Sequence, residues 1–157
     1  MNEDEDAKMW RVIEKYGVVF CRYYLGGFNL VSGLNYFILF WPQPRMADSV
    51  GDTFVLAAME LNLFAFAKVI EIIAGACLVF NRFVPLALVL LMPVTMNIFL
   101  TNVPWSPLPH IQLSVTRNLV MHLILLGAYA NYFYPLLRFR TAPQPVWRNP
   151  LRVKRSL

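Results

Sequence analysis

Two charged residues within an apolar run are the part of this sequence whose residue types could do chemistry. Lys68 and Glu71 lie in the run Phe64–Phe80, which is otherwise almost entirely apolar. Charged side chains in a membrane-spanning helix are costly, so they normally face a protein interior or a water-filled cavity. At about 100° per residue, Glu60, Lys68 and Glu71 fall within one arc of roughly 80°, with Gly75 beside it. The run is therefore expected to form a membrane helix whose charged side packs against other helices.

Polar residues in the other apolar runs are expected at similar depths. At a rise of about 1.5 Å per residue, His122 lies near the middle of its run, with Asn118 one turn outward on the same face. Asn97 lies about one turn outward from the middle of its own run. The first run has a stripe of polar and small residues at helical spacing: Arg22, Gly26, Asn29 and Gly33. These faces can meet in the interior of one bundle.

Two main interpretations of these residues stay open. In the first, Lys68 and Glu71 form an ion pair between positions i and i+3, the Asn, Ser and His side chains form interhelical hydrogen bonds, and the glycines allow close helix packing. In the second, Lys68, Glu71 and His122 line a cavity that binds a polar head group or relays protons. A quinone head group would suit Lys68 and His122 as hydrogen-bond donors. An interface with another membrane subunit is the third interpretation.

The sequence does not favour a catalytic or metal-binding site. The sequence has no Gly-rich phosphate loop, nucleophile elbow or HExxH motif. Cys21 and Cys77 are far apart, without CxxC or Cys/His ligand spacing, so we interpret them as small buried hydrophobic residues. His122 and Glu71 without a further ligand motif do not favour a metal site.

The composition is that of a membrane protein. Hydrophobic residues make up 58% of the 157 residues and charged residues 15%, with a mean hydropathy of +0.51. Soluble domains usually carry about a quarter charged residues. No cleavable signal peptide is expected, because the start is polar and acidic. The net charge of +5 comes from residues that flank the apolar runs, which indicates membrane topology rather than nucleic-acid binding.

The predicted fold class is all-α, a four-transmembrane-helix bundle, because about 20 apolar residues span a membrane. The domain boundaries are an acidic segment 1–10, a membrane domain 11–137 and a basic C-terminal tail 138–157. The expected spans are 17–41, 54–80, 83–103 and 111–137. We prefer one continuous helix over 54–80. The alternative, prompted by Glu60 and Asn62, is a separate interfacial or re-entrant piece over 54–63.

The basic residues predict the topology. Lys and Arg crowd both ends of the chain and Arg82 lies in the middle turn, whereas the two other loops hold only Arg45. The positive-inside rule then places both termini in the cytoplasm. The tight turn at Asn81 and Arg82 makes the second and third helices adjacent and antiparallel. The proline-rich tail is expected to contact anionic lipids or a partner through its basic residues, which are Arg138, Arg140, Arg148, Arg152, Lys154 and Arg155.

Three segments resemble the DoxX-like family of small four-helix membrane proteins. The segment 22–37, RYYLGGFNLVSGLNYF, is similar to the family's first helix, although Tyr36 stands where a Lys is usual. Glu71 and Gly75 resemble its Glu-x-x-x-Gly second helix with a short turn, and the segment 92–103, MPVTMNIFLTNV, resembles its Pro-x-x-x-Asn-Ile segment. The resemblance implies a subunit or companion of membrane oxidoreductases, including quinone-linked ones. Related eukaryotic proteins act as assembly factors.

The function expected from these observations is an accessory or structural subunit of a larger membrane complex, of the redox or electron-transport kind, in a bacterial inner membrane. The alternatives are a quinone-reactive oxidoreductase membrane subunit and an assembly factor for another membrane protein. The expected partners are membrane lipids and other integral membrane subunits, with no nucleic acid. No catalytic activity of its own is expected, and quinone or lipid are the candidate ligands.

Overall fold

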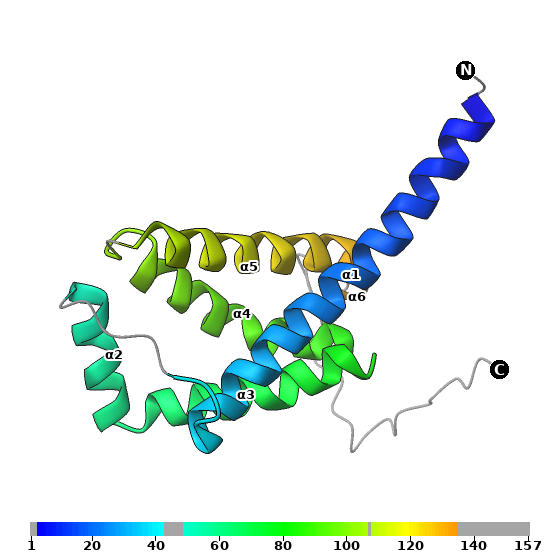
Figure 1. Ribbon diagram of the computed structural model, residues 1–157. Coiled ribbons are helices and arrows are strands. Elements are labelled where there is room, and N and C mark those ends of the chain that lie inside the picture. Colours follow the sequence, from blue (N-terminus) through cyan, green and yellow to red (C-terminus); the bar gives the residue numbers. More distant parts are fainter. Residues whose placement is uncertain (1–2, 43–48, 107, 135–157) are drawn as a thin grey trace, which may run out of the picture.

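The computed structural model describes residues 3–42, 49–106 and 108–134 (Figure 1). Every regular element in these ranges is a helix, so the predicted all-α class is confirmed for them. The helices are α1 (Glu3–Ile38), α2 (Val50–Glu60), α3 (Leu63–Val79), α4 (Val84–Asn102), α5 (Pro109–Ala128) and α6 (Ala130–Phe133).

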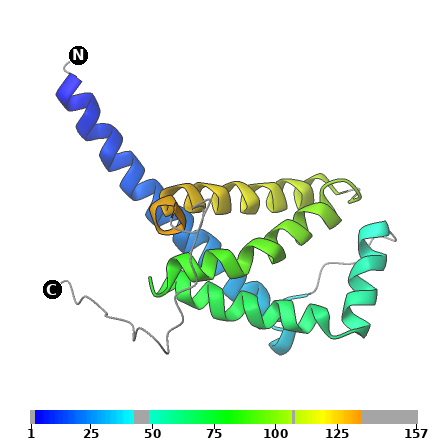
Figure 2. The same cartoon turned by 180° about the vertical axis from the view of Figure 1, so that it is seen from behind.

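Four of the helices pack into one bundle. Helix α1 packs along α3, α3 packs on α4, α4 on α5, and α5 closes back onto α1. The N-terminal part of α1 projects beyond the other helices, as both views show (Figures 1 and 2). Helix α2 lies at the opposite end of the bundle and contacts α3 and α4. The core is built from fully buried leucines of four helices: Leu25, Leu78, Leu88, Leu91 and Leu125.

Large apolar side chains cover much of the outer surface of the bundle. Phe66, Leu86, Leu113 and Leu123 are examples that are at least half exposed. Exposed apolar side chains in this number are typical of a chain that contacts lipid or other proteins.

Two helices, α4 and α5, are long and apolar enough to cross a membrane. The bent pair α2–α3 counts as a third candidate if the pair is one broken span. Within the described residues, α1 does not reach the same apolarity, because polar and small residues interrupt its apolar stretch, among them Arg22, Asn29 and Asn35. Two of the four expected spans therefore correspond to helices that are long and apolar enough to cross a membrane, or three if the bent pair is one span.

The structure shows that the preferred prediction of a single helix over 54–80 is wrong. Helix α2 ends at Glu60, α3 begins at Leu63, and their axes differ by 89°. Asn62 adopts the left-handed conformation with φ 59°, which asparagine tolerates better than most residues and which ends a right-handed helix. The alternative, a separate piece before the span, is confirmed in that this piece forms a helix separate from α3. This piece begins at Val50 rather than at 54, because Ser49 and Asp52 form a capping box.

The other helix bounds are close to the expected spans. Helix α4 covers 84–102 of the expected 83–103, and Pro93 lies inside it. Helix α5 covers 109–128 of the expected 111–137 and is followed by the short α6. Helix α1 already begins at Glu3, inside the segment 1–10, and ends at Ile38.

Candidate ligand-binding cavity

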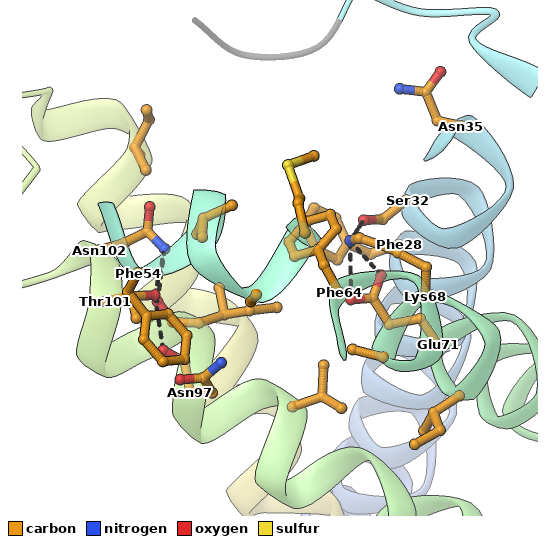
Figure 3. A pocket seen from close by; sticks show the side chains of 18 of the residues that line it. Phe28, Ser32, Asn35, Phe54, Phe64, Lys68, Glu71, Asn97, Thr101 and Asn102 are labelled. Atoms are coloured by element: carbon orange, nitrogen blue, oxygen red, sulfur yellow. Dashed lines mark hydrogen bonds and ion pairs between the residues drawn. The ribbon is translucent and has the colours of Figure 1, made fainter. Parts of the chain in front are cut away.

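A cavity of about 1090 Å³ lies among α1, α2, α3 and α4 (Figure 3). Its wall is mainly apolar, and α5 adds only Ile111. The aromatic and aliphatic lining residues include Phe28, Val31, Phe54, Val55, Phe64 and Ile98. This volume is slightly larger than that of typical small-molecule pockets, which are about 300–1,000 Å³ and mostly apolar.

An ion pair on α3 forms one polar end of the cavity. Lys68 Nζ donates to the two carboxylate oxygens of Glu71 at 2.9 and 2.8 Å, and to Ser32 Oγ of α1 at 2.9 Å (Figure 3). The Lys68 and Glu71 side chains are only 11% and 2% exposed. The Phe64 ring lies 5.1 Å from Lys68 Nζ. The pair carries no net charge, so the cavity offers dipoles and lone pairs rather than an uncompensated ion.

Close packing of α1 on α3 brings Ser32 to this pair. A methyl group at Gly75 would lie 2.7 Å from the backbone nitrogen of Leu30, and one at Gly33 would lie 2.8 Å from the carbonyl oxygen of Lys68. Only glycine at these positions lets the two backbones approach so closely. Gly26 is packed in the same way against Leu78 and Gly75. The structure thus places Gly26, Gly33 and Gly75 at one helix contact.

The C-terminal end of α4 forms a second polar group on the other side of the cavity. Thr101 Oγ1 donates to the Asn97 carbonyl oxygen at 2.8 Å, and Asn102 Nδ2 donates to the Ile98 carbonyl oxygen at 2.8 Å and to Thr101 Oγ1 at 3.2 Å. Figure 3 shows this group apart from Lys68 and Glu71, with apolar side chains between them. Asn97 is exposed and lines the cavity. The cavity therefore has an apolar middle and two polar ends.

His122 is not brought together with Lys68 and Glu71. It is fully buried between α4 and α5, where Nε2 lies 3.0 Å from the Leu88 carbonyl oxygen and Nδ1 lies 3.0 Å from Thr95 Oγ1. Since a carbonyl can only accept, Nε2 donates to Leu88 and Nδ1 accepts from the Thr95 hydroxyl. Both ring nitrogens are occupied, so His122 acts as an interhelical hydrogen-bond bridge. This arrangement matches the first interpretation of the sequence for His122.

Two further residues of the predicted polar faces are buried, and each has one polar side-chain atom without a hydrogen-bond partner in the described part of the chain. These atoms are Asn118 Oδ1 and Arg22 Nε. The Arg22 guanidinium lies 4.9 Å from the centre of the Tyr23 ring. Asn29 is satisfied within its own helix, because its Nδ2 donates to the Leu25 carbonyl oxygen at 2.7 Å. These residues lie at helix contacts and do not line the cavity.

Metal binding receives no support from the described part of the chain, where no group of three His, Cys, Asp or Glu side chains could hold a metal ion. Cys21 is buried, Cys77 is half-buried, and both are free thiols. The predicted basic tail, from Arg138 to Arg155, lies outside the described residues.

Sequence reasoning missed Ser32, Thr101 and Asn102 as cavity residues. Ser32 could have been found, because it precedes Gly33 in the small-residue stripe of the first helix. Thr101 and Asn102 carry no such signal, since only the bend before α3 makes the end of α4 part of a cavity wall.

The polar end at Lys68 can bind a neutral head group. Among the described residues, the Glu71 carboxylate accepts hydrogen bonds from Lys68 alone, and each of its oxygens has lone pairs to spare. The Ser32 hydroxyl can still donate its own hydrogen. Hydrogen bonds of this kind are strengthened in a low-dielectric interior. A hydroxyl or carbonyl group of a ligand could therefore be held here while its apolar part contacts the aromatic wall.

Comparison with known proteins gives no match to a family model, to a curated protein or to a solved structure. The resemblance to the DoxX-like family stays a prediction.

Proposed function

We propose that this chain is a four-span integral membrane protein of the DoxX-like type, with both termini in the cytoplasm. Helices α4 and α5 and the broken pair α2–α3 support three of the spans. Helix α1 supports the fourth, because glycine contacts pack it tightly along α3. Its polar residues face the bundle in part, since Arg22 and Asn29 are buried. The basic residues at both ends of the sequence favour a cytoplasmic location for the termini.

Its proposed role is that of an accessory subunit of a larger membrane complex, of the redox kind, which holds a neutral amphipathic molecule such as a quinone or a lipid. The observation that carries this role is the cavity of about 1090 Å³ with a buried, internally neutralised ion pair at one polar end. A molecule with a small hydroxyl or carbonyl head and an apolar body complements that wall.

The neutrality of the ligand follows from the electrostatics of the pair. An anionic head group near Lys68 would meet the Glu71 carboxylate, whose two oxygens lie 2.8 and 2.9 Å from Lys68 Nζ. A cationic head group near Glu71 would meet Lys68 in the same way. In a low-dielectric site either repulsion is costly, so an uncharged head group is favoured.

A pull-down from mild detergent tests the accessory role. The tagged full-length chain is purified, the co-purifying proteins are identified by mass spectrometry, and the absorption spectrum of the eluate is recorded. The proposal predicts stoichiometric integral membrane partners together with absorption from a redox cofactor of the complex. A single clean species that carries neither partner nor chromophore would contradict the accessory role and leave the cavity to a stand-alone binding protein.

A further inference from the structure

An exposed arginine on α5 is one charged group of the bundle that the cavity does not explain. Arg117 is exposed, although it lies in the interior of the apolar helix Pro109–Ala128. Its contacts are a hydrogen bond of 3.4 Å from Nη2 to Ser114 Oγ and a ring contact with Tyr24 of α1, whose centre lies 5.0 Å from Cζ. The one ion pair within the described residues joins Lys68 and Glu71, so no described carboxylate neutralises Arg117.

The direction of the Arg117 side chain indicates where its partner lies. Side chains of a helix lean toward the helix N-terminus, and the bond to Ser114 shows that Arg117 does so here. The Arg117 Cα lies about 12 Å along the helix axis from Pro109. Because the side chain leans toward the helix N-terminus, the guanidinium lies several ångströms nearer to that end. Trp41, after α1, and Trp105, before α5, are exposed at this end of the bundle. Exposed tryptophans mark the boundary between the hydrocarbon and head-group layers.

The Tyr24 contact leaves the guanidinium ready to bind an anion. The guanidinium lies over the Tyr24 ring in a cation–π contact, and its one hydrogen bond within the described residues, from Nη2 to Ser114, leaves further N–H donors for a ligand. Phosphate oxygens match the planar fork of a guanidinium, and such charge-assisted hydrogen bonds are among the strongest in proteins. Tyr24 itself is flanked by Phe20 and Phe28 on α1, at ring-centre distances of 6.1 and 6.4 Å. This aromatic row offers an apolar surface for an acyl chain beside the cation.

We propose that Arg117, with Tyr24 and Ser114, binds the phosphate of one anionic phospholipid on the outer surface of α1 and α5. The inference rests on the proposed membrane placement. Tyr24 and Phe28 also line the cavity, so the Arg117 variants are what separate the lipid site from the cavity ligand. Charge complementarity, the preformed contact of the guanidinium with Tyr24 and the depth of the side chain all favour a lipid head group. Free phosphate would lack the acyl chain that contacts the Phe20, Tyr24 and Phe28 row.

Native mass spectrometry of the full-length chain in neutral detergent tests this site. The probes are dioleoyl phosphatidylglycerol and dioleoyl phosphatidylcholine, which share their acyl chains and differ in net charge. The proposal predicts one tightly held phosphatidylglycerol, with Arg117→Gln weakening its binding about tenfold, as expected for the loss of one charge-assisted contact. Arg117→Lys should retain part of the affinity. Arg82→Gln, which removes an exposed arginine from the α3–α4 turn, should leave it unchanged.

Several outcomes would overturn the proposal. They are equal binding of the two lipids by the unmodified chain, an unchanged affinity in a folded Arg117→Gln variant, and an equal loss in Arg82→Gln, which would indicate general charge attraction. Displacement of the lipid by inorganic phosphate would identify a soluble anion as the ligand instead. Loss of a membrane protein partner in Arg117→Gln, with lipid binding intact, would assign Arg117 to a protein interface. Release of the chain from membranes by alkaline carbonate would contradict the membrane placement itself and thereby the proposed function.

Discussion

At the scale of single residues, Lys68 and Glu71 are stable inside the bundle because each compensates the other. The Lys68 ammonium donates to both Glu71 oxygens and to Ser32 Oγ, so all three of its hydrogens are used. Both side chains are almost completely buried, which makes a charge without its partner costly there. The free energy of unfolding should therefore depend more on whether the two charges are present together than on either charge by itself.

Substitution of one partner alone tests this coupling. Glu71→Gln leaves a buried ammonium without its carboxylate and should lower the free energy of unfolding by about 3 kcal/mol. The double variant Lys68→Met/Glu71→Leu removes both charges and should recover most of that loss. Reversible denaturant unfolding of the full chain in one detergent measures both. A double variant that is as unstable as the single one would show that the ion pair itself is not the source of stability.

His122 is predicted to matter for stability and not for ligand content. His122→Ala removes a fully buried ring and its bonds to Thr95 and Leu88, which should cost about 3 kcal/mol. Thr95→Val removes one of these bonds and should cost about 1 kcal/mol. The amount of extracted amphipathic molecule per folded protein should equal that of the unmodified chain. A folded His122→Ala protein that has lost the molecule would place His122 in the binding site after all.

At the scale of elements, the contact between α1 and α3 depends on glycines that touch backbone atoms. A methyl group at Gly75 would meet the Leu30 nitrogen at 2.7 Å and the Gly26 carbonyl oxygen at 2.8 Å, and neither atom can rotate away. The helices would have to separate, which would also move Ser32 away from Lys68. A methyl group at Gly17, nearer the N-terminus of α1, would meet nothing within 4 Å.

These two glycines make a matched pair for thermal unfolding. Gly75→Ala should lower the free energy of unfolding by about 1–3 kcal/mol through overpacking. Gly17→Ala should leave it unchanged or raise it by up to about 1 kcal/mol, because alanine is the better helix former. If Gly75→Ala unfolded at the same temperature as Gly17→Ala, the close approach of the two helices would be refuted.

The sequence predicts the helices better than their arrangement. Apolar runs and prolines place α4 to within one residue at each end, because both signals are local. The spacing of three between Lys68 and Glu71 likewise predicts their ion pair. The neighbour of His122 is not predictable in this way, since helical periodicity gives the face of a side chain but not the helix that the face meets. Asn62 suggested a break, yet only the structure gives the 89° bend.

At the scale of the whole molecule, the cavity exists because the chain turns before α3. The bend sets α2 across the end of the bundle, where a methyl group at Gly51 would clash with the Thr101 carbonyl oxygen. This close contact fixes α2 against the end of α4. Lining residues then come from Tyr24 on α1 to Ile111 on α5, so no short segment encodes the cavity. A continuous helix over 54–80 would have left this side of the bundle open.

The central claim is that the cavity holds a neutral amphipathic molecule, and organic extraction of the purified chain tests it most directly. Gly27 lines the cavity and has open space at its Cβ position, so Gly27→Leu should fill part of the cavity without disturbing the helices. Gly17→Leu is the control, because it adds the same side chain to the same helix at another open position away from the cavity.

The measurement is the molar ratio of extracted molecule to protein, determined by mass spectrometry after purification in one mild detergent. The account predicts a ratio near one for the unmodified chain and for Gly17→Leu, and a ratio several-fold lower for a folded Gly27→Leu protein. No uncharged amphipathic molecule in the unmodified chain, or an equal ratio in Gly27→Leu and Gly17→Leu, would contradict it.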